Sequence, residues 1–177
     1  MKNNIRNNIR FIVIAGMTAA LYVALTVLSA QFGLSSGAIQ LRISEALCVL
    51  PVYTAAAIPG LTIGCLLANL VIGSTVYDII FGTLATLIGA IAACMLRRMK
   101  YLAFIPTVVA NMLIVPAVII VSATESWTLF PYFAATVGLG ELIVCGILGD
   151  LLVWYFEKHP SVTKALFPER MSSRGQK

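Results

Sequence analysis

The stretch IRFIVIAGMTAALYVALTVLS, residues 9–29, decides the fold. After Arg10 it holds no charged side chain, and the uncharged run continues as far as Arg42. A helix that crosses a bilayer needs roughly 20 mainly apolar residues, because the hydrocarbon core is about 30 Å thick. We therefore predict a transmembrane helix from about Ile9 to Ser29. It is too long for the apolar region of a signal peptide and lacks a small-x-small cleavage site before Gln31, so we expect it to be retained.

The rest of the chain repeats this pattern. Of its 177 residues 60% are hydrophobic and 11% charged, whereas a soluble domain carries about 25% charged residues. Pro59 is expected to end the second helix, because proline lacks the backbone donor and disfavours helix in the residue before it. The remaining spans lie in the uncharged intervals 46–77, which has room for two, 79–96 and 101–124, and after Pro131. We predict an all-α integral membrane protein, a compact bundle of six transmembrane helices.

The basic residues indicate the topology. The net charge is +5, and eleven of the twelve Lys and Arg residues fall into three groups. Six spans put both termini on one side, together with the connection between the fourth and fifth helices. Because membrane proteins keep Lys and Arg in cytoplasmic loops, we expect both termini to be cytoplasmic. The groups are Lys2, Arg6 and Arg10; Arg97, Arg98 and Lys100; and Lys158, Lys164, Arg170, Arg174 and Lys177.

This topology divides the chain into three parts. Residues 1–8 form a cytoplasmic N-terminal segment, 9–157 the six-helix transmembrane substrate-binding domain, and 158–177 a basic cytoplasmic tail that we expect to be weakly ordered. The chain is predicted to be a multi-pass protein of the cell membrane that contacts the lipid bilayer. We expect no nucleic-acid partner, because the basic excess follows topology and does not form a stripe on a folded face.

The cysteines and the single histidine predict neither a metal site nor a cofactor. Cys48, Cys65, Cys94 and Cys145 are widely spaced within apolar runs, and His159 is the only histidine. We interpret the cysteines as buried thiols that pack as small apolar groups. The sequence also shows no nucleophile–base pairing at a useful spacing, so we expect that the protein is not an enzyme.

A few polar residues lie where the membrane makes them costly. A charged side chain at the bilayer centre costs at least about 2.5–3.5 kcal/mol and usually marks function. Glu141 lies some ten residues into the last helix, about 15 Å along it, and no Lys or Arg shares its span. On helices two to six these residues are predicted to form a polar cup that opens outward, with the first helix apart. The cup residues are Arg42, Glu45, Asn69, Asp78, Asn111 and Glu141.

Several of these residues also admit a purely structural interpretation. Arg42 and Glu45, three positions apart, could form an ion pair at the membrane interface. Asp78 could cap the N-terminus of the fourth helix, and Asn69 and Asn111 could join helices by hydrogen bonds. A cup with carboxylates, amides and one arginine suits a small polar heterocycle that carries a positive charge.

The first helix has small residues at fourfold spacing. Ala15 and Ala19 form one row, and Gly16, Ala20 and Ala24 form the next. Such rows let helix backbones approach closely in lipid. They serve either packing within the bundle or contact with a partner protein.

Four segments resemble the QueT family. They are QLRISEAL at 40–47, PGLTIGCLLAN at 59–69, DIIFGTLATL at 78–87 and GLGELI at 138–143, together with Asn111. The resemblance covers about residues 9–157, and the first two segments are its most specific part. Members of this family are substrate-binding S components of energy-coupling-factor (ECF) transporters.

The resemblance implies both a substrate and a mechanism. The substrate would be a queuosine precursor or queuine, all built on 7-deazaguanine. The S component would capture it outside and dock on a module of one membrane coupling protein and two ATPases, whose ATP-driven movement turns the pocket inward. The row formed by Ala15 and Ala19 resembles the docking face of other S components. Glu141 and Asn111 would bind the guanine-like edge, and Glu45 or Asp78 an aminomethyl cation.

Three alternatives stay open. The chain could be an S component for a different vitamin such as thiamine or riboflavin, a membrane enzyme, or a purely structural helix bundle. It carries no G-x-x-x-x-G-K-[ST] loop, so it is not expected to power transport alone. No residues in the sequence support the hypothesis of a membrane enzyme, and the hypothesis of a purely structural bundle leaves Glu141 unexplained.

Overall fold

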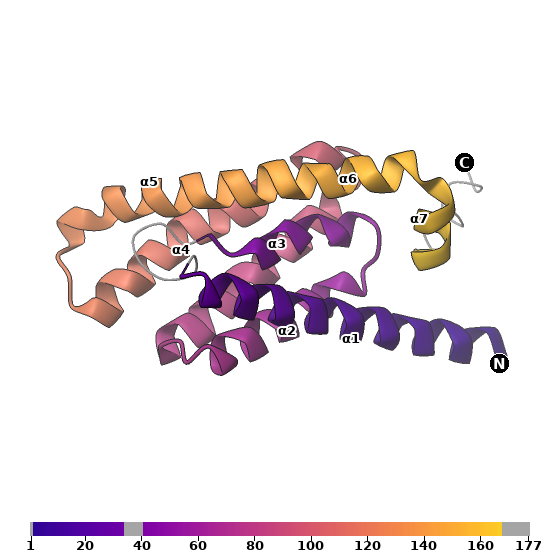
Figure 1. Cartoon of the computed structure of the whole chain (residues 1–177), viewed down its shortest axis with the longest axis horizontal. Coiled ribbons are helices and arrows are strands. Elements are labelled where there is room, and N and C mark those ends of the chain that lie inside the picture. The colour runs from indigo at the N-terminus through magenta and orange to yellow at the C-terminus, as the bar shows by residue number, and fades with distance from the viewer. Residues whose placement is uncertain (1, 34–40, 168–177) are drawn as a thin grey trace.

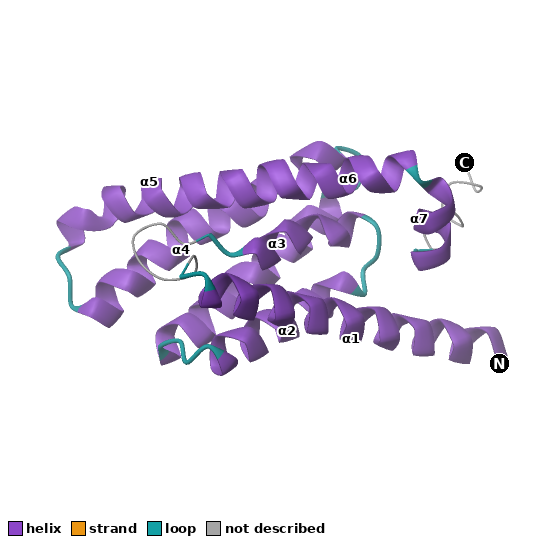
Figure 2. Cartoon of the chain, in the orientation of Figure 1, coloured by secondary structure: helices purple, strands orange, loops and turns teal. Residues whose placement is uncertain are grey.

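A computed structural model describes residues 2–33 and 41–167 of the chain, and in this part every regular element is helical (Figure 2). The segment from Gln31 to Leu41, whose polar residues, glycines and serines predict a loop, lies largely outside the described residues, as does the end of the basic tail. The chain runs back and forth along one direction as an elongated bundle (Figure 1). Four helical segments are long and apolar enough to cross a membrane: Ile5–Gln31, Asp78–Met95, Lys100–Ala123 and Trp127–Lys158.

The longest continuous helix is α1, Lys2–Gln31. It starts before the predicted Ile9 and contains most of the segment 1–8. The last crossing is also continuous and is built from α5 (Phe130–Glu141), the π-helix η5 (Leu142–Leu148) and α6 (Gly149–Lys158). Between them lie the π-helix η2 (Asp78–Gly82) followed by α3 (Thr83–Met95), and α4 (Ile105–Ala123). Short 3₁₀ turns η3 (Lys100–Leu102) and η4 (Trp127–Leu129) join these segments.

Two shorter apolar helices replace the predicted second and third spans. The first, η1 (Ile43–Val52), is a 3₁₀-helix and not the expected α-helix, and α2 (Ala57–Val71) begins before Pro59, which lies in its first turn. At about 2.0 and 1.5 Å per residue, each is shorter than the roughly 30 Å hydrocarbon core. The turn between them, including Tyr53 and Ala56, is buried. The structure thus supports four full spans and a short helical hairpin, while the count of six stays a prediction.

The segment after Lys158 is not the weakly ordered tail we predicted, at least as far as residue 167. It forms α7 (Pro160–Leu166), and Phe167 is buried against the rings of Tyr53 and Phe156. A guanidinium nitrogen of Arg10 donates to the carbonyl of Ala165 at 2.6 Å. Apolar contact with the turn of the hairpin and this hydrogen bond to α1 hold the segment in place.

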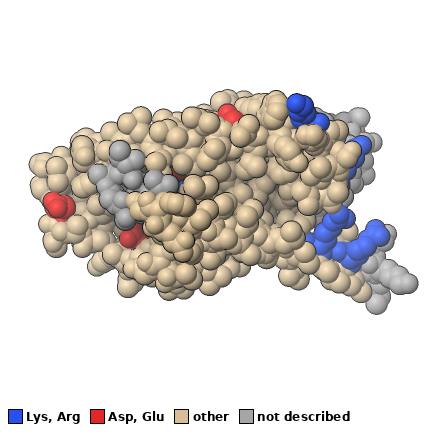
Figure 3. Space-filling view, in the orientation of Figure 1, with Lys and Arg blue, Asp and Glu red and all other residues tan. Residues whose placement is uncertain are grey.

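The start of α1 and the helix α7 lie at the same end of the molecule (Figure 1). Most Lys and Arg side chains visible in Figure 3 gather at this end. This asymmetry is what the basic groups predicted from the sequence. The cytoplasmic side of the termini stays a prediction, since it follows from the charge rule.

Close helix packing rests on small residues. A Cβ atom added at Gly60 of α2 would lie 2.8 Å from the carbonyl oxygen of Ala15, and one at Gly64 would lie 2.8 Å from Cβ of Tyr22. A similar close approach joins α3 and α4 at Gly89, where an added Cβ would lie 2.6 Å from Oγ1 of Thr107. These glycines allow the backbone approach that stabilises helices in lipid.

Candidate functional site

A small polar cavity lies between η1, η2, α3, α4 and α5. Its volume is about 20 Å³, which is room for about one water molecule. Four of the six predicted cup residues line it: Arg42, Glu45, Asn111 and Glu141. The other lining residues are Gly82, Thr86, Val115 and Val137.

Glu141 is buried at the end of α5, with both carboxylate oxygens hydrogen-bonded. Asn111 Nδ2 on α4 donates to Oε1 at 2.8 Å, and the Cys145 thiol donates to Oε2 at 3.1 Å. The π-helical turn η5 begins directly after Glu141. Single π turns inside α-helices are frequent at functional sites. Asn111 thus links α4 to α5 by a hydrogen bond and at the same time lines the cavity.

Glu45 is also buried, with 3% of its surface exposed. Its Oε1 accepts a hydrogen bond from the hydroxyl of Tyr22, and its backbone carbonyl lies 3.4 Å from Cys145 Sγ. The suggested ion pair with Arg42 is wrong: within the described residues the only salt bridge joins Lys100 and Glu157. The carboxylate of Glu45 is held by α1 instead of by its neighbour in sequence.

Arg42 lines the cavity and contacts α2. Its Nη1 donates to Oδ1 of Asn69 at 3.1 Å. Its Nε is buried and has no hydrogen-bond acceptor in the ranges 2–33 and 41–167. An unpaired buried donor is costly unless something pairs with it. Arg42 thus keeps a hydrogen-bonding group that the described residues leave unused.

Asn69 and Asp78 lie beside the cavity and do not line it. Asn69 is fully buried and donates from Nδ2 to the backbone carbonyl of Asp78 at 3.3 Å, which fixes the start of η2 against α2. The Asp78 carboxylate accepts the hydroxyl of Thr75 at 2.9 Å, and Oγ1 of Thr75 accepts from the Asp78 backbone N–H at 3.2 Å. At this helix start it is thus the Thr75 hydroxyl that accepts a backbone N–H, while the Asp78 carboxylate bonds Thr75 and caps no described backbone group.

The residue that sequence reasoning missed is Tyr22. The first helix was expected to lie apart from the cup, and this expectation is wrong. Tyr22, Thr26 and Ser29 form a buried polar row along α1. Thr26 Oγ1 donates to Oγ of Ser44 at 2.7 Å, and Oγ of Ser29 accepts the backbone N–H of Ile43 at 3.1 Å. The spacing of three and four residues was a signal, since it puts the three hydroxyls on one helical face.

Three atoms of metal-ligand type meet at the cavity. A carboxylate oxygen of Glu45, one of Glu141 and the Cys145 sulfur lie within 4.8 Å of one another. Each already has a partner, because Tyr22 donates to Glu45 and the thiol itself donates to Glu141. A thiol that donates its proton is not the thiolate that binds metals. The expectation of no metal and no cofactor stays a prediction.

The two small-residue rows of α1 differ in exposure. Ala19 is buried and Ala15 half-buried, because Gly60 and Gly64 of α2 pack on this side of the helix. The neighbouring row, Gly16, Ala20 and Ala24, is exposed. The row of Ala15 and Ala19 thus has a packing role within the chain, and its predicted docking role is untested.

Comparison with known proteins gives one match, to a family of proteins. No curated protein and no solved structure matches the chain significantly. The sequence model of a family described as QueT transporter matches residues 12–158. The match covers most of the chain and includes every element that lines the cavity. The chain belongs to the QueT transporter family.

Proposed function

We propose that the chain is the substrate-binding S component of an ECF transporter and that the polar cavity is its binding site for a 7-deazaguanine. The observation that carries the proposal is the meeting of Glu45 and Glu141 at one cavity inside a helical membrane protein of the QueT family. Two carboxylates deep in such a bundle are costly. A ligand rich in donors or carrying a positive charge repays this cost.

The chemistry of a deazaguanine matches this wall. Its edge presents a ring N–H beside an exocyclic amine, and a carboxylate accepts both in a bidentate way. Glu141 is assigned this edge, with the Asn111 amide beside it at 2.8 Å to serve a further ring atom. Glu45 is assigned an aminomethyl cation, with Asp78 as the other candidate. The Nε of Arg42, for which no described residue supplies an acceptor, is available to an acceptor on the ligand, such as a ring carbonyl.

Binding requires that the cavity open. About 20 Å³ holds one water molecule and not a two-ring heterocycle. We assign the movement to η1, which carries Glu45 and directly follows Arg42, since both residues line the cavity. A ten-residue 3₁₀-helix is unusually long, and its hydrogen-bond geometry is poorer than that of an α-helix, so η1 can rearrange at lower cost than its neighbours. The present conformation is then the closed state of the site.

The proposed partner is an ECF module of one membrane coupling protein and two ATPases. Docking is assigned to α1, because its row of Gly16, Ala20 and Ala24 is exposed while Ala15 and Ala19 face α2. A helix with small exposed residues allows close approach of a second membrane helix. In the cell membrane, the module would supply the ATP-driven step.

The deciding experiment is calorimetry of the purified full chain. The ligands are the nitrile precursor, the aminomethyl precursor, queuine and guanine, with thiamine and riboflavin as competing vitamins. We expect tight binding of at least one deazaguanine and weaker binding of guanine. Tight binding of thiamine or riboflavin instead would identify a different S component. Weak binding of every compound would refute the proposal.

A further inference from the structure

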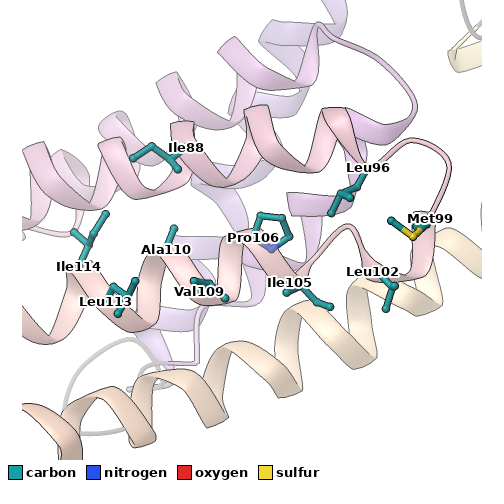
Figure 4. Close-up of a pocket in the computed structure, with 10 residues that line it drawn as sticks. All are labelled: Ile88, Leu96, Met99, Leu102, Ile105, Pro106, Val109, Ala110, Leu113 and Ile114. Carbon is teal, nitrogen blue, oxygen red and sulfur yellow. The ribbon is translucent and has the colours of Figure 1, made fainter.

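A long apolar groove lies on the outside of the bundle between α3 and α4 (Figure 4). It shares no lining residue with the polar cavity. Its volume is about 610 Å³, and every residue that lines it is apolar. Ile88 and Leu96 come from the α3 side, Ala110 forms part of the floor, and Val109 and Leu113 stand along α4. Val109 and Leu113 are exposed, so the groove opens to the surface of the protein.

The groove has the length of one leaflet. Along α4 its lining runs from Ile105 to Ile114, which is about 14 Å at 1.5 Å per residue. Half of a bilayer's hydrocarbon core is about 15 Å thick. The groove therefore extends from one membrane interface to about the middle of the membrane, as an acyl chain does.

The interfacial end of the groove carries positive charge. Leu96 and Met99 line this end, and the two residues between them, Arg97 and Arg98, are exposed. The next basic residue, Lys100, is engaged in a salt bridge with Glu157. Arg97 contacts Cys94 Sγ at 3.0 Å through one guanidinium nitrogen, which leaves further donors of its fork available. A guanidinium binds phosphate oxygens in a bidentate way.

A second outer groove, of about 460 Å³, lies between α1 and α6 but differs at its charged end. There Leu166 and Phe167 form part of the wall, and Arg10 donates to the backbone of α7. The helix α7 therefore covers the end of this groove where a headgroup would lie. The groove between α3 and α4 has exposed arginines in the corresponding place.

We propose that the groove between α3 and α4 is a binding site for an anionic phospholipid of the leaflet that faces the basic loops. One acyl chain lies along Val109, Ala110 and Leu113, and the phosphate is held by Arg97 and Arg98. Basic sites between transmembrane helices at this interface bind anionic headgroups. The inference does not depend on which substrate the protein carries.

The test is native mass spectrometry of the full chain released from mixed micelles. The probes are dioleoyl-phosphatidylglycerol and dioleoyl-phosphatidylcholine, which share acyl chains and differ in headgroup charge. We expect phosphatidylglycerol to bind about 30-fold more tightly, the factor that two basic residues near a membrane surface supply. The double variant Arg97→Gln/Arg98→Gln should lose this preference. The control Arg6→Gln/Lys164→Gln removes the same charge from two other exposed positions and should keep it.

A groove variant tests the acyl chain separately. Val109→Trp fills the groove at an exposed position, so it should fold normally and bind both lipids more weakly. Equal binding of the two lipids to the wild-type chain would overturn the proposal. So would a preference that survives in Arg97→Gln/Arg98→Gln, or one that disappears in the control. Unchanged lipid binding by Val109→Trp would show that the groove is not the site.

Discussion

The hydroxyl of Tyr22 on α1 donates a hydrogen bond to the carboxylate of Glu45 on η1, and both side chains are buried. The contact joins the helix to which we assign docking with a wall of the proposed binding cavity. Gly64 of α2 packs closely against Tyr22, since an added Cβ at Gly64 would lie 2.8 Å from Cβ of Tyr22. The orientation of Glu45 therefore depends on how α1 packs against α2.

Tyr22→Phe tests this dependence. The variant keeps the ring but removes the donor to a buried carboxylate, and hydrogen bonds to charged groups contribute about 1.5–3 kcal/mol. We expect the affinity for the best-binding deazaguanine to fall by about tenfold or more in calorimetry. Thr26→Val removes the hydroxyl one turn along the same row, which bonds Ser44 and not a cavity residue. This control should bind as wild type, and equal losses in both variants would show that the effect is only structural.

Glu141→Gln tests the central carboxylate. The amide oxygen can still accept the hydrogen bond from Asn111, but it cannot accept two ligand donors as a carboxylate does. We expect at least about tenfold weaker binding with little change in thermal stability, since losing a bidentate charged contact costs more than about 1.4 kcal/mol. Binding as tight as wild type would refute the assigned role.

The matched control for Glu141→Gln is Asp150→Asn. Asp150 lies on the same crossing, in the first turn of α6, and does not line the cavity. It should bind ligand as wild type does. A loss in Asp150→Asn as large as that in Glu141→Gln would point to a general effect of acidic residues on this helix.

Gly64→Ala tests the contact between α1 and α2. The new methyl group would lie 2.8 Å from Cβ of Tyr22 and 3.1 Å from Cα of Ala19, so backbone must move. Overpacking of this kind costs about 1–3 kcal/mol, and the thermal unfolding midpoint in detergent should fall. Gly16→Ala places the same methyl group on α1 with no atom within 4 Å. It should be neutral or stabilise by up to about 1 kcal/mol, and a reversed order would contradict the packing described.

Ala20→Trp tests docking on α1. Ala20 is exposed, so the large ring should leave the fold and ligand binding intact but prevent close approach of a partner helix. We expect the variant to lose co-purification with the ECF module. Ile147→Trp, at an exposed position of η5, should co-purify normally. Retained co-purification of Ala20→Trp would place the docking face elsewhere.

Much of the fold followed from charge-free intervals in the sequence. They predicted a helical membrane protein, and the structure has four helices of spanning length in those intervals. The hairpin of η1 and α2 was not foreseen as such, because an apolar run shows that a segment is buried and not whether it winds as a 3₁₀- or an α-helix. Four residues of the predicted cup line one cavity: Arg42, Glu45, Asn111 and Glu141. The other two, Asn69 and Asp78, do not line it and are hydrogen-bonded to each other beside it.

The sequence by itself determined that this chain is a membrane protein and that few polar groups are available for function. It did so because a charge in hydrocarbon is so costly that its mere presence is informative. Only the tertiary structure decided which partners those groups have. Glu45 pairs with Tyr22 across 23 positions, Glu141 with Asn111 across 30, and Arg42 with Asn69 across 27. Contacts at such separations depend on how close the helices pack, and glycines such as Gly64 permit that closeness only when two particular faces meet.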